Sequence, residues 1–242
     1  MMAIKKNNIK VLIVAAGQGR RSGLSYPKTL FKINKTPILI RIIRKILHID
    51  NKPTIVVSPK GKNLVKNCLN KYSFKSELLI QSKPKGMGDA VLQFKKSKYF
   101  ISTSNILLIW GDLPFIYKRS INNLVSNFES KKYFFSLITG LSKNPYTYIL
   151  RDKFDNICEV IESRKTRIKL LKGEREIGVF IFKKELIKFL NKKKKFDFID
   201  NKKEHNFLYI VNSLYKKKFK LGSSPITNEK EFKSLNYLKD VL

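Results

Sequence analysis

The decisive stretch of the sequence is Ile9-Lys10-Val11-Leu12-Ile13-Val14-Ala15, which runs directly into Ala16-Gly17-Gln18-Gly19. A continuous, β-branched apolar run that ends at glycine is typical of a strand buried on both faces of a parallel sheet. The apolar residues 11–16 are too few for a membrane span and too few for the core of a signal peptide. We therefore expect a buried strand at Ile9–Ala15, followed by a glycine loop.

Strands and helices alternate after this stretch. The apolar spacing predicts helix Pro37–Ile49, strand Thr54–Ser58, helix Lys62–Lys71, strand Glu77–Gln81, a helix from Asp89, strand Asn105–Trp110, helix Arg119–Glu129 and strand Tyr133–Thr139. Such alternation is typical of α/β domains. We predict a Rossmann-like, mostly parallel sheet with helices on both faces.

The regular alternation of strands and helices ends after Gly140. The second half predicts antiparallel strands Tyr146–Arg151 and Asn156–Glu162 joined by a turn, strand Ile177–Phe182, helices Glu185–Lys192 and Phe207–Tyr215, strand Phe219–Gly222 and a terminal helix Glu229–Val241. These elements indicate a small antiparallel lobe that returns to the same sheet. No low-complexity linker interrupts the chain, so we expect residues 1–242 to form one domain.

The charge is strongly basic, with 51 Lys and Arg against 18 acids and a net charge of +33. A chain of this charge binds polyanions non-specifically. Lysine supplies most of the excess and, like Asn, Ile, Phe and Tyr, has A/T-rich codons, so genome composition accounts for it. We expect solvated lysines and no specific nucleic-acid partner, and keep a polyanion-binding role as an alternative. Two cysteines make no disulfide framework, which favours the cytoplasm.

The first loop carries the densest chemical signal. It follows a strand, at the sheet edge where open α/β folds bind ligands, and its glycines allow backbone amides to approach phosphate oxygens. Arg21 and Lys28 add two cations. The loop lacks the Gly-Lys-Ser/Thr of a Walker A motif, and Ser22 breaks the G-x-G-x-x-G pattern. The alternative is a tight turn with solvated basic residues.

Three blocks in the N-terminal half resemble the nucleotidyltransferases that make nucleoside-diphosphate sugars. Ala15–Arg21 with Pro27-Lys28 resembles their A-A-G-x-G-T-R and P-K motifs. The other two blocks resemble bacterial N-acetylglucosamine-1-phosphate uridyltransferases: Gln81–Val91 is similar to Q-x-x-x-x-G-T-G-D-A-V, and Leu107–Ile116 is similar to L-x-x-x-G-D-x-P-L-I. The C-terminal half matches more loosely, and the hexapeptide-repeat acetyltransferase domain of bifunctional members is absent from residues 1–242.

The resemblance implies that a sugar 1-phosphate, such as N-acetylglucosamine 1-phosphate, attacks the α-phosphate of UTP and releases pyrophosphate. It implies catalytic roles for Arg21 and Lys28. It implies nucleotide-binding roles for Ala15, Ala16, Gly17, Gly19, Gln81, Gly86 and Met87, and sugar-binding roles for Thr147, Glu162 and Glu176. Asp112 would bind Mg²⁺, with Thr227 or Asn228 as the second ligand. The expected partners are thus a nucleoside triphosphate and a sugar phosphate, in cell-envelope biosynthesis.

The sequence departs from the family pattern at the base and sugar positions. Pro84 and Met87 replace a base-reading Gln and Thr, Thr147 replaces a glycine, and Glu176 replaces a sugar-binding Asn. These changes imply altered base and sugar specificity around an unchanged phosphate site. Two alternatives therefore stay open: a cytidylyltransferase for a non-sugar phosphate, and an inactive basic binding protein on the same fold.

Simpler interpretations exist for single residues. Asp112 also suits a cap of the segment that follows it. Gln81 also suits a solvated strand end, and Glu162 a surface ion pair with Arg164 or Lys165.

Overall fold

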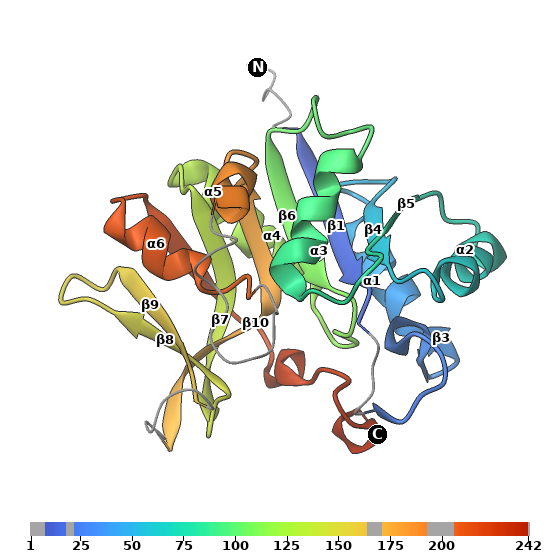
Figure 1. Ribbon diagram of the computed structural model, residues 1–242. Helices are drawn as coiled ribbons and strands as arrows, with labels where there is room; N and C mark the ends of the chain where they lie inside the picture. Colours follow the sequence, from blue (N-terminus) through green and yellow to red (C-terminus); the bar gives the residue numbers. More distant parts are fainter. Residues whose placement is uncertain (1–7, 18–21, 164–170, 193–205, 242) are drawn as a thin grey trace, which may run out of the picture.

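The computed structural model describes residues 8–17, 22–163, 171–192 and 206–241. Its main sheet has seven strands in the spatial order β11-β7-β10-β6-β1-β4-β5 (Figure 1). The strands are β1 Ile9–Ala15, β4 Thr54–Val57, β5 Glu77–Ile80, β6 Asn105–Trp110, β7 Phe135–Lys143, β10 Lys172–Lys183 and β11 Leu221–Pro225. Neighbours are parallel except where β10 runs antiparallel to β6 and β7. The predicted mostly parallel α/β sheet is confirmed.

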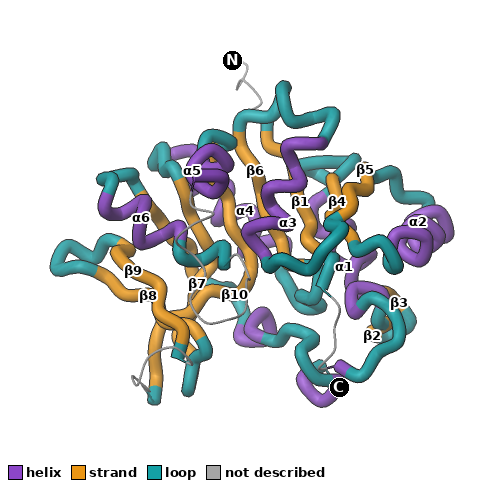
Figure 2. Tube along the Cα trace, viewed as in Figure 1, coloured by secondary structure: helices purple, strands orange, loops and turns teal. Residues whose placement is uncertain are grey.

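Helices cover both faces of this sheet (Figure 2). They are α1 Ile38–Ile46, α2 Lys62–Lys71, α3 Met87–Leu92, α4 Lys118–Ser130, α5 Leu186–Lys192 and α6 Ile210–Lys216. Strand β1 shows how one sequence serves two cores, because successive side chains of a strand point to opposite faces. Leu12 and Val14 pack on the side of α3, α5 and α6, whereas Val11 and Ile13 pack on the side of α1, α2 and α4.

The predicted antiparallel lobe is present beside the sheet. Strands β8 (Thr147–Arg151) and β9 (Ile157–Glu162) pair antiparallel, and the lobe packs against β10 and α6. Their turn forms where the sequence places Asp155, whose φ of 63° is the left-handed conformation that Asp and Asn tolerate. The carboxylate of Asp152 accepts hydrogen bonds from the backbone N–H groups of Phe154 and Asn156, which fixes the turn.

The predicted bounds of β1, β6 and α2 agree with the structure, and most other elements differ at their ends by one to four residues. A short hairpin was not predicted: β2 (Lys32–Ile33) and β3 (Thr36–Pro37) pair antiparallel. Its two-residue turn has positive φ at Asn34 and Lys35, the conformation of hairpin turns. No helix in the described ranges is long and apolar enough to cross a membrane.

The predicted terminal helix Glu229–Val241 is wrong. Two 3-10 turns, η4 (Glu229–Phe232) and η5 (Leu238–Asp240), stand in its place. An α-helix would need the N–H of Leu235 to bond the carbonyl of Glu231. Instead the N–H of Leu235 donates to the carbonyl of Asp112 at 3.0 Å, and its buried side chain joins the core. Tertiary docking has replaced the helix that local sequence favours.

Strand β10 is longer than predicted because it has two dissimilar halves. Its apolar half, Val179–Phe182, pairs with β6 and β7, as the sequence indicates. Its first half is polar and pairs with β7 alone, so it carries little hydrophobic signal. A bulge between Glu176 and Phe180 separates the halves, and Gly178 has a φ of 88° there.

Candidate active site

The candidate site lies where β1 and β6 end side by side. The N–H of Gly111 donates to the carbonyl of Val14 at 2.9 Å, which ties the two strand ends together. A side chain at Gly111 would put its Cβ 3.0 Å from both the Val14 carbonyl and the Ala15 Cβ, so glycine permits this approach. Ala15 ends β1, and Ala16 and Gly17 follow it, as predicted. Gly19 and Arg21 lie outside the described residues.

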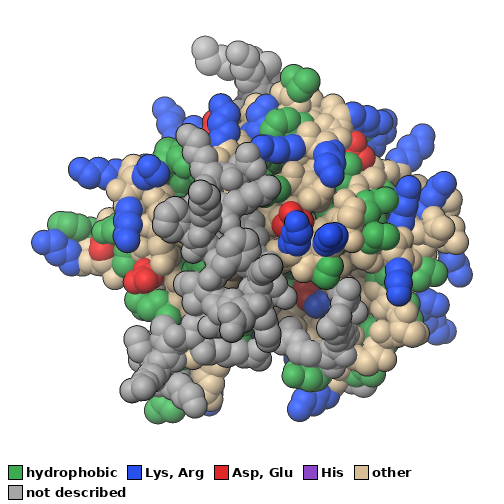
Figure 3. Space-filling model, in the orientation of Figure 1, with side chains coloured by type: hydrophobic (Ala, Val, Ile, Leu, Met, Phe, Trp, Pro, Cys, Tyr) green, Lys and Arg blue, Asp and Glu red, His purple; other side chains and the backbone are tan. Residues whose placement is uncertain are grey.

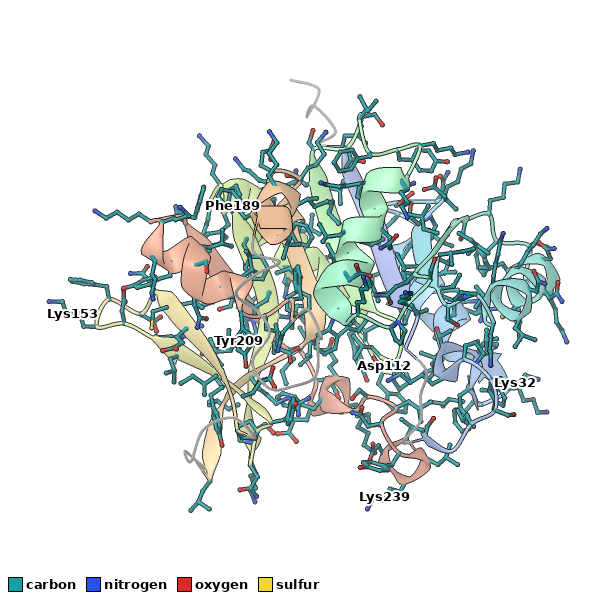
Figure 4. All side chains as sticks on the ribbon, in the orientation of Figure 1. Lys32, Asp112, Lys153, Phe189, Tyr209 and Lys239 are labelled. Atoms are coloured by element: carbon teal, nitrogen blue, oxygen red, sulfur yellow. The ribbon has the colours of Figure 1, made fainter. Side chains whose placement is uncertain are left out.

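The ammonium of Lys28 contacts the carboxylate of Asp112 at this edge. Lys28 Nζ donates to Asp112 Oδ2, and also to the carbonyl of Leu235 at 3.3 Å. Asp112 lies just beyond β6, at the carboxyl end of the central strands (Figure 4). Residues 84 positions apart thus meet as an ion pair. The sequence placed each at a strand end or glycine loop, but not in contact.

A pocket surrounds this pair. It is lined by Val14, Ala15, Gly17, Lys28, Thr29, Met87, Trp110, Gly111 and Asp112. Of the residues predicted for the site, five therefore share one cavity: Ala15, Gly17, Lys28, Met87 and Asp112. Such a pocket, beyond the carboxyl ends of parallel strands, is where open α/β sheets bind ligands.

Buried polar atoms without partners gather at this pocket. In the described part of the chain, six buried side-chain atoms have no hydrogen-bond partner: Thr29 Oγ1, Ser76 Oγ, Trp110 Nε1, Asp112 Oδ1, Ser136 Oγ and Glu176 Oε2. Thr29, Trp110 and Asp112 line the pocket. Each such atom calls for an explanation, and a bound polar ligand supplies one. Sequence reasoning missed Thr29 and Trp110; Trp110 directly precedes Gly111-Asp112 and is the chain's only tryptophan.

The Gln81 side chain supports the turn that begins α3. Its Nε2 donates to the carbonyl of Gly86 at 3.0 Å and to Asp89 Oδ2 at 2.9 Å. Gly86 has a φ of 93°, which a side chain would strain, so a glycine is needed there. These contacts deliver Met87 to the pocket. Gln81 is buried, so the interpretation as a solvated strand end is wrong.

The three predicted sugar-binding residues lie close together at the junction of lobe and sheet. Thr147 and Glu162 are paired across β8 and β9, and Thr147 Oγ1 donates to Glu176 Oε1 at 3.3 Å. Glu162 is buried and accepts hydrogen bonds from the Asn206 amide and from the Tyr146 hydroxyl. Burial raises the pKa of Glu176 above its ordinary value, despite the nearby Arg175 charge.

Thr227 and Asn228 form a network at the start of α4. Thr227 Oγ1 lies 2.8 Å from Ser120 Oγ, and the carboxylate of Glu231 accepts from the backbone N–H groups of Thr227 and Asn228. Asn228 also caps η4 by accepting from the N–H of Lys230. Both predicted metal ligands are therefore engaged in local hydrogen bonds, and the metal role of either stays a prediction.

The fold and the pocket define a class: an α/β domain that presents a cavity holding a Lys–Asp ion pair at the carboxyl edge of its parallel strands. Residues 11–170 match the family described as the MobA-like NTP transferase domain. This match spans more than half of the sequence, and the chain belongs to that family.

Relatives within this class are bifunctional GlmU proteins. That of Buchnera aphidicola subsp. Schizaphis graminum is 38% identical over 144 residues, which cover 59% of this chain and 30% of the relative. That of Thermodesulfovibrio yellowstonii is 29% identical over 231 residues, which cover 93% of this chain and 49% of the relative. The chain thus spans about half, or less, of the length of the relatives it matches. It is a member of a nucleotidyltransferase family and is similar to the matched part of these relatives.

Solved structures share the fold at low sequence identity. A protein assigned as a glucose-1-phosphate thymidylyltransferase from Bacillus anthracis superposes with a TM-score of 0.73 at 16% identity, covering 90% of this chain and 87% of the other. The inositol-1-phosphate CTP transferase from T. maritima gives 0.68 at 14% identity, with 89% and 84% covered. At these identities the likeness concerns the fold alone.

Proposed function

We propose that the chain joins a sugar 1-phosphate to UTP with release of pyrophosphate. The observation that carries the proposal is the Lys28–Asp112 pair in a pocket where Asp112 keeps one buried oxygen without a partner. The family match and the GlmU relatives support this reaction class. The acceptor would be N-acetylglucosamine 1-phosphate or a related sugar 1-phosphate.

The residues of the pocket suit Mg²⁺. Mg²⁺ prefers hard oxygen ligands and is commonly held by one or two carboxylates together with substrate phosphates. The open Oδ1 of Asp112 offers such an oxygen, and Lys28 shows that a cation already fits beside Oδ2. The described residues contain no cluster of three or more His, Cys, Asp or Glu side chains, so substrate phosphates would complete the coordination. When bound, the ion neutralises phosphate charge and aligns the reacting groups.

The chain's own residues then have defined tasks. Lys28 reaches the phosphates from beside Gly17, since a Cβ on that glycine would lie 3.9 Å from Lys28 Cε. An ammonium in this position stabilises charge that builds up as an acceptor oxygen attacks the α-phosphate and pyrophosphate leaves. Backbone groups of residues 15–17 would hold the triphosphate, together with the predicted Gly19 and Arg21. The scheme needs no covalent protein nucleophile, so positioning and charge neutralisation carry the catalysis.

A cytidylyltransferase acting on a non-sugar phosphate is the second candidate. Met87 lines the pocket where the resembled uridyltransferases have a base-reading Thr, so its apolar side chain gives no hydrogen bond for uracil. The fold likeness to a CTP transferase is compatible with this candidate. An inactive polyanion-binding protein is the third; Lys and Arg side chains are scattered over the face shown in Figure 3 rather than gathered in one patch.

Pyrophosphate release separates these candidates. The purified chain is incubated with Mg²⁺, each of the four common nucleoside triphosphates and a panel of sugar 1-phosphates and non-sugar phosphates. We expect turnover with UTP and a sugar 1-phosphate. Turnover with CTP and a non-sugar phosphate would select the second candidate. Absence of turnover with every pair, from a folded protein, would favour the third.

A further inference from the structure

Glu231 is a buried carboxylate that receives hydrogen bonds from two distant parts of the chain. It lies in η4 and is 2% exposed. Its Oε1 accepts from the N–H of Tyr117 at 3.0 Å. Its Oε2 accepts from the Ser120 hydroxyl at 2.7 Å and from the N–H of Thr227 at 2.9 Å. A buried charge is costly unless hydrogen bonds satisfy it, so this carboxylate is a fixed junction between the start of α4 and the turn after β11.

The segment that begins at Glu231 runs beside the connection from β6 to α4. At one end of the two segments, the N–H of Tyr117 bonds Glu231. At the other end, the N–H of Leu235 bonds the carbonyl of Asp112 at 3.0 Å. The Leu235 side chain is fully buried and belongs to the same core cluster as Leu113. One segment therefore fixes both ends of the loop that carries Asp112.

The backbone of Leu235 also reaches the second partner of the ion pair. Its carbonyl accepts from Lys28 Nζ at 3.3 Å, while its N–H bonds the Asp112 carbonyl. Lys28 in turn contacts the Asp112 carboxylate. Leu235 lies outside residues 11–170, the part of the chain that matches the family. The place of both charged groups thus depends on where this segment is anchored.

Phe232 gives the segment a second anchor. A Cβ on Gly140 would lie 2.7 Å from the Phe232 ring, so strand β7 packs closely against it. The carbonyl of Phe232 accepts from Arg175 Nη2 at 3.4 Å, and the guanidinium lies 5.1 Å from the ring centroid. With this anchor and the buried Leu235 in place, loss of the Glu231 carboxylate should shift the segment without unfolding the chain.

We propose that Glu231 is a positioning residue: by anchoring the segment along the loop after β6, it holds Lys28 and Asp112 in the arrangement that the reaction needs. Glu231 bonds neither of them directly, so it acts through the backbone of Leu235. Catalysis by positioning is sensitive to such support, because a displacement of about 1 Å can cost roughly a hundredfold in rate. The inference rests on the proposed function, in which Lys28 and Asp112 act on the phosphates.

Steady-state kinetics of Glu231→Ala test this role. We expect kcat to fall at least about tenfold while KM for UTP changes little, because the groups that bind substrate are still present but misplaced. The matched control is Glu229→Ala, which removes an exposed carboxylate from the same 3-10 turn and should change neither parameter. Rates are measured well below the melting temperature of each variant. An unchanged kcat in folded Glu231→Ala would overturn the proposal.

A double-mutant cycle shows whether Glu231 acts through Lys28. In a Lys28→Ala background the ammonium is already absent, so Glu231→Ala should lower kcat by only about threefold or less. A purely structural role would instead multiply the two losses. If Glu231→Ala does not fold, Glu231→Gln replaces it, because the amide nitrogen of Gln cannot accept from a backbone N–H. An unchanged kcat in Glu231→Gln would then overturn the proposal.

Trp110 lines the pocket and gives a readout that does not require turnover. With UTP present, the Mg²⁺ concentration at half of the fluorescence change should rise about tenfold in Glu231→Ala, as for groups that orient metal ligands. It should stay at the wild-type value in Glu229→Ala. The same value in all three proteins, or no Mg²⁺-dependent change in the wild type, would overturn the positioning role. If the shift occurs but no triphosphate gives turnover, the positioning role stands and the proposed reaction fails.

Discussion

Two lysine–aspartate ion pairs lie at opposite edges of the sheet and differ in how completely they are bonded. At the amino end of β1, Lys10 Nζ bonds Asp50 Oδ1 at 3.1 Å and the carbonyl of Lys52 at 2.5 Å, and lies 3.6 Å from the centroid of the Tyr99 ring. Asp50 also accepts the backbone N–H groups of Val11 and Lys52, both at 3.0 Å. Every charge of this pair has its partners.

The pair at the carboxyl edge is less complete. Lys28 and Asp112 contact each other, but Asp112 Oδ1 is buried and bonds nothing in the described part of the chain. Their side chains keep 21% and 12% exposure, against 9% and 8% for Lys10 and Asp50. The hollow beside Lys10 is the larger, about 330 Å³ against about 100 Å³, yet none of the unpartnered atoms lies in its lining. Unmet hydrogen bonding, rather than cavity size, distinguishes the edge where we propose the active site.

Neutralising Asp112, in the less completely bonded pair, should have the largest effect on activity. Asp112→Asn keeps the shape and removes the charge that would hold Mg²⁺. We expect kcat to fall by about 10²–10³, the loss typical of removing one group that stabilises transition-state charge. The check is pyrophosphate release at saturating Mg²⁺, beside a thermal melt. A near-normal rate would remove Asp112 from the mechanism.

Neutralising Asp50, in the fully bonded pair with Lys10, should lower stability rather than activity. Asp50→Asn leaves Lys10 buried without its counterion, which costs about 3 kcal/mol at the lower end of the range for a broken buried pair. The melting temperature should fall by about 6–12 °C. The turnover number at 25 °C should stay near the wild-type value. If Asp50→Asn lost activity without losing stability, the Lys10–Asp50 pair would not be purely structural, and the proposed difference between the two pairs would be wrong.

Removing the ammonium of Lys28 should have an intermediate effect. Lys28→Ala is expected to lower kcat by roughly ten- to a hundredfold while KM changes little, because the cation acts mainly on charge that develops in the transition state. Steady-state kinetics separate the two parameters. A raised KM with an unchanged kcat would show that Lys28 only binds substrate.

At this edge, the sequence predicts the strand ends well and the contacts between distant residues poorly. Strands β1 and β6 are continuous apolar runs that end at glycine-containing turns, so their ends, and with them Gly17 and Asp112, were located from the sequence. The contact of Lys28 with Asp112 depends on how two distant loops fold back. The segment around Leu235 reads as a helix locally, but its peptide group bonds Asp112 and Lys28 instead. Such contacts have no periodic signature.

The candidate sugar pocket shows the same limit. Thr147, Glu162 and Glu176 were found through resemblance to a family, and the structure brings Thr147 beside both glutamates. The open oxygen of Glu176 and the open donor of Trp110 have no signal in the sequence. Gly178 packs against the Trp110 ring at the bulge of β10, and only the paired strands reveal that bulge.

A third ion pair, in the lobe, gives the smallest expected effect. Arg151 binds Glu174 through two nitrogens, each at 2.8 Å. Burial acts to raise the pKa of Glu174, but hydrogen bonds from Arg151 and Thr139 and the charge of Arg151 outweigh it, so the pKa is lowered. A depressed carboxyl pKa stabilises the fold above the unfolded value of about 4.3 and loses that contribution as pH falls through the folded value.

The difference in unfolding free energy between wild type and Glu174→Gln should therefore shrink between pH 6 and pH 3. Urea unfolding across this range measures it, with activity at pH 7 as the control for an intact site. A difference that stays constant with pH would mean that the pKa of Glu174 is the same in the folded and the unfolded chain. Glu174 would then not belong with the structural pairs.

The fluorescence of Trp110 tests the central claim most directly. This only tryptophan of the chain lines the pocket beside Asp112, so a ligand that enters changes its surroundings. Titration with UTP should give a saturable change that requires Mg²⁺, survives in Asp50→Asn and is lost in Asp112→Asn. A change that is independent of Mg²⁺, or is the same in Asp112→Asn as in the wild type, would contradict a metal-assisted phosphate site at the carboxyl edge.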